Sequence, residues 1–179
     1  MASFVYVDNS NVWIEGMRVS AVRNGQAPDM WVAQKEKIVD FDWKPDFGKL
    51  YEIAGGEVVG RARMYGSRPP ANDSLWRAAE QQGFEVIVFD RNAGNREKKI
   101  DTQIATDIVS DSYDWMQTER GDEVRLVAGD SDYVPVAEKL RERGFACIVV
   151  FWEHAARELK EAASEFVSLD EHLDALNRG

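Results

Sequence analysis

Two aspartates, Asp130 and Asp132, lie one residue apart at a point where the sequence changes character. An apolar run that includes Leu126 leads into Gly129 just before them, and an amphipathic run begins at Val134 just after them. This pattern predicts a buried strand that ends at a charged corner and turns directly into a helix. Helix capping by Asp explains one acidic residue at such a corner. The second carboxylate indicates that something cationic binds there.

Two further aspartates are expected to reach the same corner. Asp8 ends the first apolar run, residues 4–7, and functional groups of an open parallel sheet gather outside the carboxyl ends of its strands. Asp101 lies at the start of a predicted helix, in helical register with Ala105 and Ile108, so it points toward the sheet. A carboxylate in that position is costly unless it is paired or bound to a metal.

Carboxylates gathered in this way require a counter-charge. Two of them about 4 Å apart repel by roughly 4 kcal/mol at an effective dielectric constant of 20. Oxygen ligands favour a hard cation, Mg²⁺ or Mn²⁺, with water and substrate phosphate completing its coordination. The spacing is not that of a calcium loop, because Val134 and Pro135 stand where an EF-hand needs a ligand and a glycine. Zinc is disfavoured because the only histidines, His154 and His172, are expected at the surface.

Asp107 has a different expected position from Asp101. It is in helical register with Asp111 and Asp114, and this acidic row predicts a solvent-exposed face of the helix.

Strand-like and helical patterns alternate along the chain. Strands are predicted at about residues 4–8, 58–65, 84–89, 124–128, 145–152 and 166–167, and helices at about 12–23, 46–53, 71–82, 100–116, 132–143 and 155–163. This alternation is typical of an α/β fold with a parallel sheet covered on both faces by helices. The chain of 179 residues shows no linker or internal repeat, so one domain over residues 1–179 is expected.

The composition is that of a soluble globular protein, with 44% apolar and 30% charged residues. Cys147 is the single cysteine, which favours a reducing compartment. The sequence shows no signal-peptide pattern and no apolar run near the ~20 residues of a membrane span, so a cytoplasmic protein without membrane contact is predicted. The formal net charge of -10 argues against a general nucleic-acid coating protein, but not against an enzyme with local basic groups.

Three motifs resemble those of the NYN domain family, which includes LabA-like proteins and belongs to the PIN-like nuclease superfamily. They are Val-Asp-Asn-Ser-Asn at residues 7–11, Lys-Lys-Ile-Asp at 98–101, and Val-Ala-Gly-Asp-Ser-Asp-Tyr-Val-Pro at 127–135. The resemblance implies a three-layer α/β/α sandwich whose central, mainly parallel sheet has the strand order 3-2-1-4-5. It also implies metal-dependent ribonuclease activity.

The resemblance also assigns roles to individual residues. The catalytic and metal-binding acids would be Asp8, Asp101, Asp130 and Asp132, with Asn11 and Ser131 as polar helpers at the catalytic centre and the substrate. Lys98 matches a basic position before the middle acid. Asp107 matches an acidic position of many members, which makes it a second-tier candidate. Asn9 departs from the family, where glycine is common after the first aspartate.

The function that the resemblance implies is therefore hydrolysis of RNA, with single-stranded RNA as the expected substrate, by a Mg²⁺- or Mn²⁺-dependent ribonuclease. Basic residues on and after the loop that leaves the third strand are candidates for phosphate contacts, with a solvated loop as the alternative: Arg91, Arg96, Lys98 and Lys99.

Two other functions are weighed against this one. A PIN-like module that binds RNA or a regulatory protein partner without catalysis is the main alternative. A phospho-accepting receiver domain is less favoured, because Asp8 is followed by Asn9 and not by a second acid. Trp31, Phe41 and Trp43 suit stacking on bases or packing in the core or a dimer interface, which leaves a homodimer open.

Overall fold

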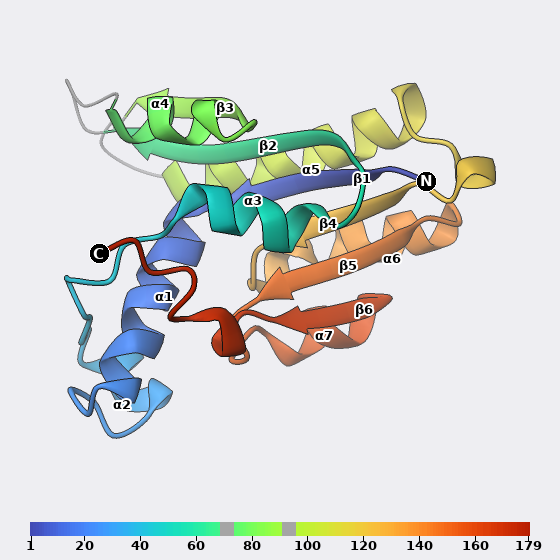
Figure 1. Ribbon diagram of the computed structural model, residues 1–179. Helices are drawn as coiled ribbons and strands as arrows, with labels where there is room; N and C mark the ends of the chain where they lie inside the picture. Colours follow the sequence, from blue (N-terminus) through green and yellow to red (C-terminus); the bar gives the residue numbers. More distant parts are fainter. Residues whose placement is uncertain (69–73, 91–95) are drawn as a thin grey trace.

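The computed structural model describes residues 1–68, 74–90 and 96–179, with the side chains at 68, 90 and 96–98 outside the description. In this part of the chain a six-stranded, all-parallel sheet has the order β3-β2-β1-β4-β5-β6 (Figure 1). The strands are β1 (Ser3–Asp8), β2 (Val59–Arg68), β3 (Glu85–Asp90), β4 (Glu123–Val127), β5 (Ala146–Phe151) and β6 (Glu165–Ser168). The predicted order 3-2-1-4-5 is confirmed, and the short strand predicted at residues 166–167 extends the sheet as β6.

Helices on both faces of the sheet complete three layers. The helices are α1 (Asn9–Arg23), α2 (Met30–Lys35), α3 (Phe47–Gly55), α4 (Ser74–Gln81), α5 (Arg96–Asp114), α6 (Val134–Glu142) and α7 (Arg157–Ala162). Helices α5 and α6 cover one face, with α7 beside α6, and α3 covers the opposite face, with α4 beside it (Figure 1). Short 3₁₀ turns occur at Thr118–Arg120, Ser131–Tyr133 and Asp170–His172. The parallel sheet covered on both faces, predicted from the alternating patterns, and the α/β/α sandwich that the resemblance implies are therefore confirmed.

Strand β1 lies at the centre of the sheet, between β2 and β4. Val5 is paired with Ala62 on one side and with Arg125 on the other, and Tyr6 and Val7 are fully buried. The chain runs outward from β1 to β2 and β3, and then crosses over to β4 on the other side of β1. The strand order thus reverses between β1 and β4, which is where open α/β sheets bind ligands.

The aromatic residues of the segment between α1 and α3 separate into two groups. Trp43 is 1% exposed and packs edge-to-face on Trp152, with ring centroids 5.6 Å apart. Trp43 therefore belongs to the core, and base stacking by this residue is excluded. Trp31 and Phe41 are 66% and 79% exposed, so they remain available for contact with a partner.

Two further sequence expectations concern the single cysteine and membrane spans. Cys147 is buried in β5, as a small apolar residue would be. Among the described residues, no helix combines the length and the apolar character that a membrane span requires.

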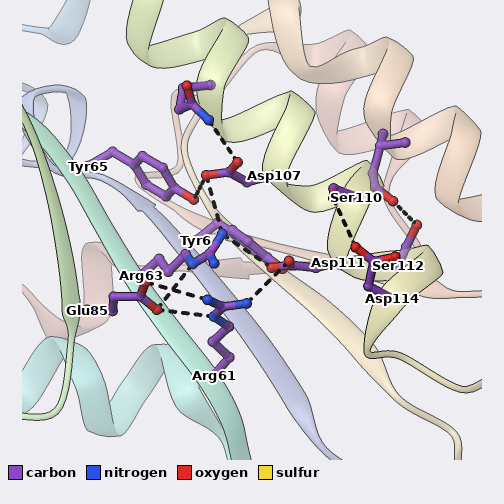
Figure 2. Close-up of polar contacts among 12 residues, drawn as sticks. Tyr6, Arg61, Arg63, Tyr65, Glu85, Asp107, Ser110, Asp111, Ser112 and Asp114 are labelled. Atoms are coloured by element: carbon purple, nitrogen blue, oxygen red, sulfur yellow. Dashed lines mark hydrogen bonds and ion pairs between the residues drawn. The ribbon is translucent and has the colours of Figure 1, made fainter.

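The expectation that the acidic row on α5 is solvent-exposed is wrong for Asp107 and Asp111. Figure 2 shows both carboxylates turned toward arginine and tyrosine side chains of the sheet. Asp107 accepts a hydrogen bond from the Tyr65 hydroxyl at 2.7 Å and lies 3.3 Å from an Arg63 Nη atom. Asp111 is 4% exposed and accepts from the Tyr6 hydroxyl at 2.6 Å.

The reason for this difference is the composition of β2. Arg61 and Arg63 are two residues apart, so they project from the same face of the strand toward α5. Arg61 lies 3.3 Å and Arg63 3.5 Å from Asp111, and these cations offset the cost of burying its charge. Asp114, at the end of α5, is exposed as expected. Helical register alone could not show what the neighbouring strand presents.

This network predicts a sharp contrast between two aspartates of one helix. Asp111→Ala should lower the free energy of unfolding by about 3 kcal/mol, because it leaves the buried Tyr6 hydroxyl without its acceptor and removes a buried carboxylate that both Arg61 and Arg63 contact. Asp114→Ala, which removes an exposed carboxylate, should change it by no more than about 0.5 kcal/mol. Urea denaturation of both variants measures the difference. A similar, small effect in the two would show that the network contributes little.

Candidate metal centre

The corner between β1 and α1 holds Asp8 in a fixed position. Asp8 is the last residue of β1 and the N-cap of α1, where its Oδ1 accepts a hydrogen bond from the backbone N–H of Asn11 at 3.4 Å. Only 6% of Asp8 is exposed, because the flanking strands and Tyr133 surround it. The run of polar residues at 8–11 therefore ends the strand and starts the helix, as Asp and Asn commonly do.

The corner after β4 positions Asp130 by a second cap. Asp130 precedes the 3₁₀ turn Ser131–Tyr133, and its Oδ1 accepts from the backbone N–H of Asp132 at 2.9 Å. Gly129 is needed here, since a Cβ at this position would lie 2.2 Å from the ring of Phe151. The absence of a side chain at Gly129 thus lets Phe151 of β5 pack tightly against the backbone just before Asp130.

Tyr133 connects the two corners with helix α5. Its hydroxyl lies 3.0 Å from Oδ1 of Asp101 and 3.3 Å from Oδ2 of Asp8. The side chain is 1% exposed, so this contact is shielded from solvent. A phenol carries one hydroxyl proton, so Tyr133 donates to one of these carboxylates at a time and holds both close to one atom.

Three carboxylates are close enough to share one ion. Oxygens of Asp101, Asp130 and Asp132 all lie within 4.8 Å of one another, similar to the ~4 Å between opposite oxygens around Mg²⁺. Asp8 is joined to this group through Tyr133. Within the residues whose side chains the structure describes, no lysine or arginine forms an ion pair with any of the four aspartates. The oxygen-only donor set therefore fits a hard cation.

The electrostatics of the centre follow from burial and mutual repulsion. Burial raises the pKa of Asp8 to about 7, and the nearby Asp101 carboxylate acts in the same direction. Burial also raises the pKa of Asp101, and the charges of Asp130 and Asp132 add to this effect, while the Tyr133 hydrogen bond opposes it. A cation would favour the charged form of each group. Perturbed carboxyls at the edge of a cavity are typical of functional sites.

A cavity of about 490 Å³ opens beside these carboxylates. Its polar residues include Asp8, Asn9, Asn11, Asp101 and Asp130. The remaining wall is largely apolar and comes from α1, α4 and the start of α5. The carboxylates are therefore accessible to a ligand from a cavity of ligand size, which is ~300–1,000 Å³.

The other candidate residues lie at varied distances from this centre. Asn11 lines the cavity, Ser131 is exposed beside Asp130, and Lys99 is exposed on α5 two residues before Asp101. Arg91 lies outside the described residues. Arg96 and Lys98 begin α5, and their side chains are likewise outside the description. Asp107 is not among the carboxylates that could share one ion and is instead bonded to Tyr65 and Arg63.

Three residues near this edge of the sheet were not identified from the sequence. Tyr133 belongs to the motif at 127–135, but its role depends on contacts with distant segments. Asn9 is 3% exposed and lines the cavity. His154, expected at the surface, is instead half-buried, with Nε2 2.6 Å from Oε2 of Glu15. The motif at 127–135 is a sequence signal for Tyr133 and the polar cluster at 8–11 is one for Asn9, whereas no pattern indicates the position of His154.

The raised pKa of Asp8 makes stability depend on pH in the metal-free protein. Because the folded-state pKa is about 7 and the ordinary value 3.8, the folded protein retains this proton when the unfolded chain has lost it. The contribution of Asp8 to the free energy of unfolding should therefore fall as pH rises from about 4 to about 7, by roughly 4 kcal/mol in total. Asp8→Asn should abolish this fall, as measured by urea denaturation in EDTA.

Asp42→Asn, which neutralises an exposed carboxylate, is the matched control and should keep the wild-type pH dependence. Asp8→Asn should have a higher free energy of unfolding than wild type at pH 8, and saturating Mn²⁺ should reduce this difference because a cation favours the ionised carboxylate. The same pH dependence in wild type and Asp8→Asn would show that Asp8 does not retain its proton.

Comparisons with known proteins agree with this architecture. The crystal structure of a protein of unknown function from Vibrio parahaemolyticus is similar over 94% of this chain and 93% of that chain, with a TM-score of 0.65 and 20% sequence identity. At that identity the similarity shows a shared fold. No curated protein matches this sequence. The NYN domain model matches residues 5–170, a range that contains all three sequence motifs. The chain therefore belongs to the NYN domain family, a family of PIN-like nucleases.

Proposed function

We propose that this protein is a metal-dependent ribonuclease that hydrolyses phosphodiester bonds of single-stranded RNA. The observation that supports this function best is the convergence of Asp8, Asp101, Asp130 and Asp132. They come from separate segments of the chain and meet at the reversal of strand order, beside a cavity. Membership of a nuclease family makes a nucleic acid the expected substrate.

Asp101, Asp130 and Asp132 would hold Mg²⁺ or Mn²⁺, with Asp8 as a further ligand or hydrogen-bond partner. When bound, the ion lowers the pKa of a coordinated water and offsets negative charge on the phosphodiester. The chemistry of oxygen ligands favours these hard cations over zinc.

The protein's own groups would supply orientation and control of protons. Caps at α1 and at the 3₁₀ turn fix the carboxyl groups of Asp8 and Asp130 before any ligand binds. The Tyr133 hydroxyl lies between Asp8 and Asp101 and would donate its proton in a hydrogen bond to one of them at a time. Asn11, on the first turn of α1, directs a polar side chain to the cavity where substrate would lie. Such preorganisation lowers the cost of positioning the reacting groups.

A non-catalytic RNA-binding or protein-binding module is the second candidate. The Tyr133 hydroxyl lies within hydrogen-bond distance of both Asp8 and Asp101 and donates to one of them at a time, so the two carboxyls share a polar partner without an ion. In a non-catalytic module the carboxyl groups of Asp8 and Asp101 would serve the stability of the fold alone. Such a protein would bind RNA without hydrolysing it.

A cleavage assay with labelled single-stranded RNA separates these functions. Wild-type protein with Mn²⁺ should cleave the RNA, EDTA should stop cleavage, and added Mn²⁺ should restore it. Asp130→Asn and Asp101→Asn should each reduce the rate at least about 100-fold, because changes around metal sites commonly cost 10–100-fold even beyond the direct ligands. Asp114→Asn, an exposed acid on the same helix as Asp101, is the matched control and should keep the wild-type rate.

The alternatives give different results in the same experiment. Equal cleavage by wild type and both site variants would indicate a contaminating nuclease and remove the support for catalysis. RNA binding without cleavage, over several substrates and with either metal, would favour the non-catalytic module. Titration calorimetry with Mn²⁺ tests the metal site separately, since Asp130→Asn should weaken binding and Asp114→Asn should not.

A further inference from the structure

The cavity beside the carboxylates has one apolar wall that phosphodiester chemistry does not require. Four residues of α1, at the spacing of one helix face, line it: Ser10, Trp13, Ile14 and Met17. Trp13, Ile14 and Met17 are only partly buried, so their side chains keep surface that faces the cavity. This face of α1 begins immediately after Asp8, the N-cap of the same helix.

The rest of the apolar lining comes from Leu75 and Trp76 of α4 and from Ile100, which directly precedes Asp101 in α5. The edge of the Trp76 ring lies against β2, since a Cβ at Gly66 would be 2.2 Å from its Cη2 atom. The glycine therefore lets the indole approach the strand closely. Together with the α1 face, these residues give the cavity an apolar part beside the carboxylates.

A buried polar group lies at the boundary between the apolar walls and the carboxylates. Asn9 is 3% exposed and lines the cavity, and its Oδ1 has no hydrogen-bond partner among the described residues. Buried amide oxygens are normally bonded, so one without a partner marks a position for a ligand donor. The amide of asparagine pairs well with the polar edge of a nucleobase, as it does with adenine in DNA recognition.

The charge of the cavity selects the kind of group that fits. Asp8, Asp101 and Asp130 line it, and no described cationic side chain does. A second phosphate in the apolar half would be repelled by these acids and would lose its hydration. A neutral aromatic ring has neither disadvantage, and stacking on tryptophan increases its binding affinity.

We propose that the apolar half of this cavity binds one unpaired nucleobase of the RNA, in contact with Trp13, Leu75 and Trp76, with Asn9 at its polar edge. The inference rests on the proposed ribonuclease function and adds a requirement on its substrate. A base inside the cavity cannot remain paired, and the phosphodiester attached to its nucleotide lies at the carboxylates. Cleavage is thereby restricted to unpaired nucleotides that carry a base.

The first experiment changes the RNA and leaves the protein intact. A single-stranded RNA with one abasic nucleotide should be cleaved next to that nucleotide about tenfold more slowly than the same phosphodiester in unmodified RNA, since stacking of one base contributes about that much affinity. Cleavage at distant positions of the same molecule is the internal control. Equal cleavage at the abasic and unmodified position would overturn the base-binding site.

The second experiment changes the wall. Trp13→Ala should raise KM for single-stranded RNA about tenfold, and Trp13→Phe should recover most of the loss because it keeps an aromatic face. Trp115→Ala is the matched control, since Trp115 is 60% exposed and lies near Met1, at the amino end of β1 and away from the carboxylates. Equal KM values for all four proteins would contradict the proposal.

A binding measurement supplies a result that does not depend on turnover. In Asp130→Asn protein, RNA that carries 2-aminopurine should lose fluorescence on binding because the base stacks on Trp13, and adding Trp13→Ala should abolish this loss. If wild-type protein neither binds nor cleaves RNA, the proposed function and the base site fall together. If it cleaves RNA but tolerates both the abasic nucleotide and Trp13→Ala, the base site alone is wrong.

Discussion

Repulsion among carboxylates is the constraint around which this structure is arranged. Asp8 and Asp101 are close enough to contact the same Tyr133 hydroxyl, and Asp130 and Asp132 lie nearby. Burial strengthens the repulsion, since little water remains to screen it. Tight packing of β1 and β4, two helix caps and one phenol hold the groups together against it. This electrostatic cost is the physical basis for a cation at the centre.

Helix α5 shows how two kinds of buried acid can be distinguished. Asp107 and Asp111 are satisfied by arginines and tyrosines of the sheet, so their charges fix the helix against β1 and β2 (Figure 2). Among the residues whose side chains the structure describes, Asp101 on the same helix has no cationic partner, and its charge is influenced by acids and by the Tyr133 hydroxyl. The paired acids therefore hold the helix in the position that places Asp101 at the cavity. Partner chemistry, and not burial, therefore distinguishes the structural carboxylates from those proposed to be functional.

Most of the fold could be predicted from the sequence, because strand-like and helical patterns alternate and parallel strands place their carboxyl ends at one edge. This rule placed Asp8 and Asp130 together, and the helical register of Asp101 brought it to the same edge. The same register misplaced Asp107 and Asp111, since it cannot reveal the arginines at positions 61 and 63 of the opposing strand. The roles of Tyr133 and Asn9 could not be predicted for a similar reason, because they depend on contacts between distant segments.

The chemistry and the selectivity of the cavity come from different elements that meet at Asp8. Strand ends and α5 supply the carboxylates, whereas α1 and α4 supply the apolar walls. Asp8 belongs to both groups, since it ends β1 and also caps the helix that carries Trp13. A displacement of α1 would consequently move the apolar wall and strain the cap at the carboxylates at once. In the proposed function, the position of a base and the position of the scissile phosphodiester would therefore be coupled through a single corner of the backbone.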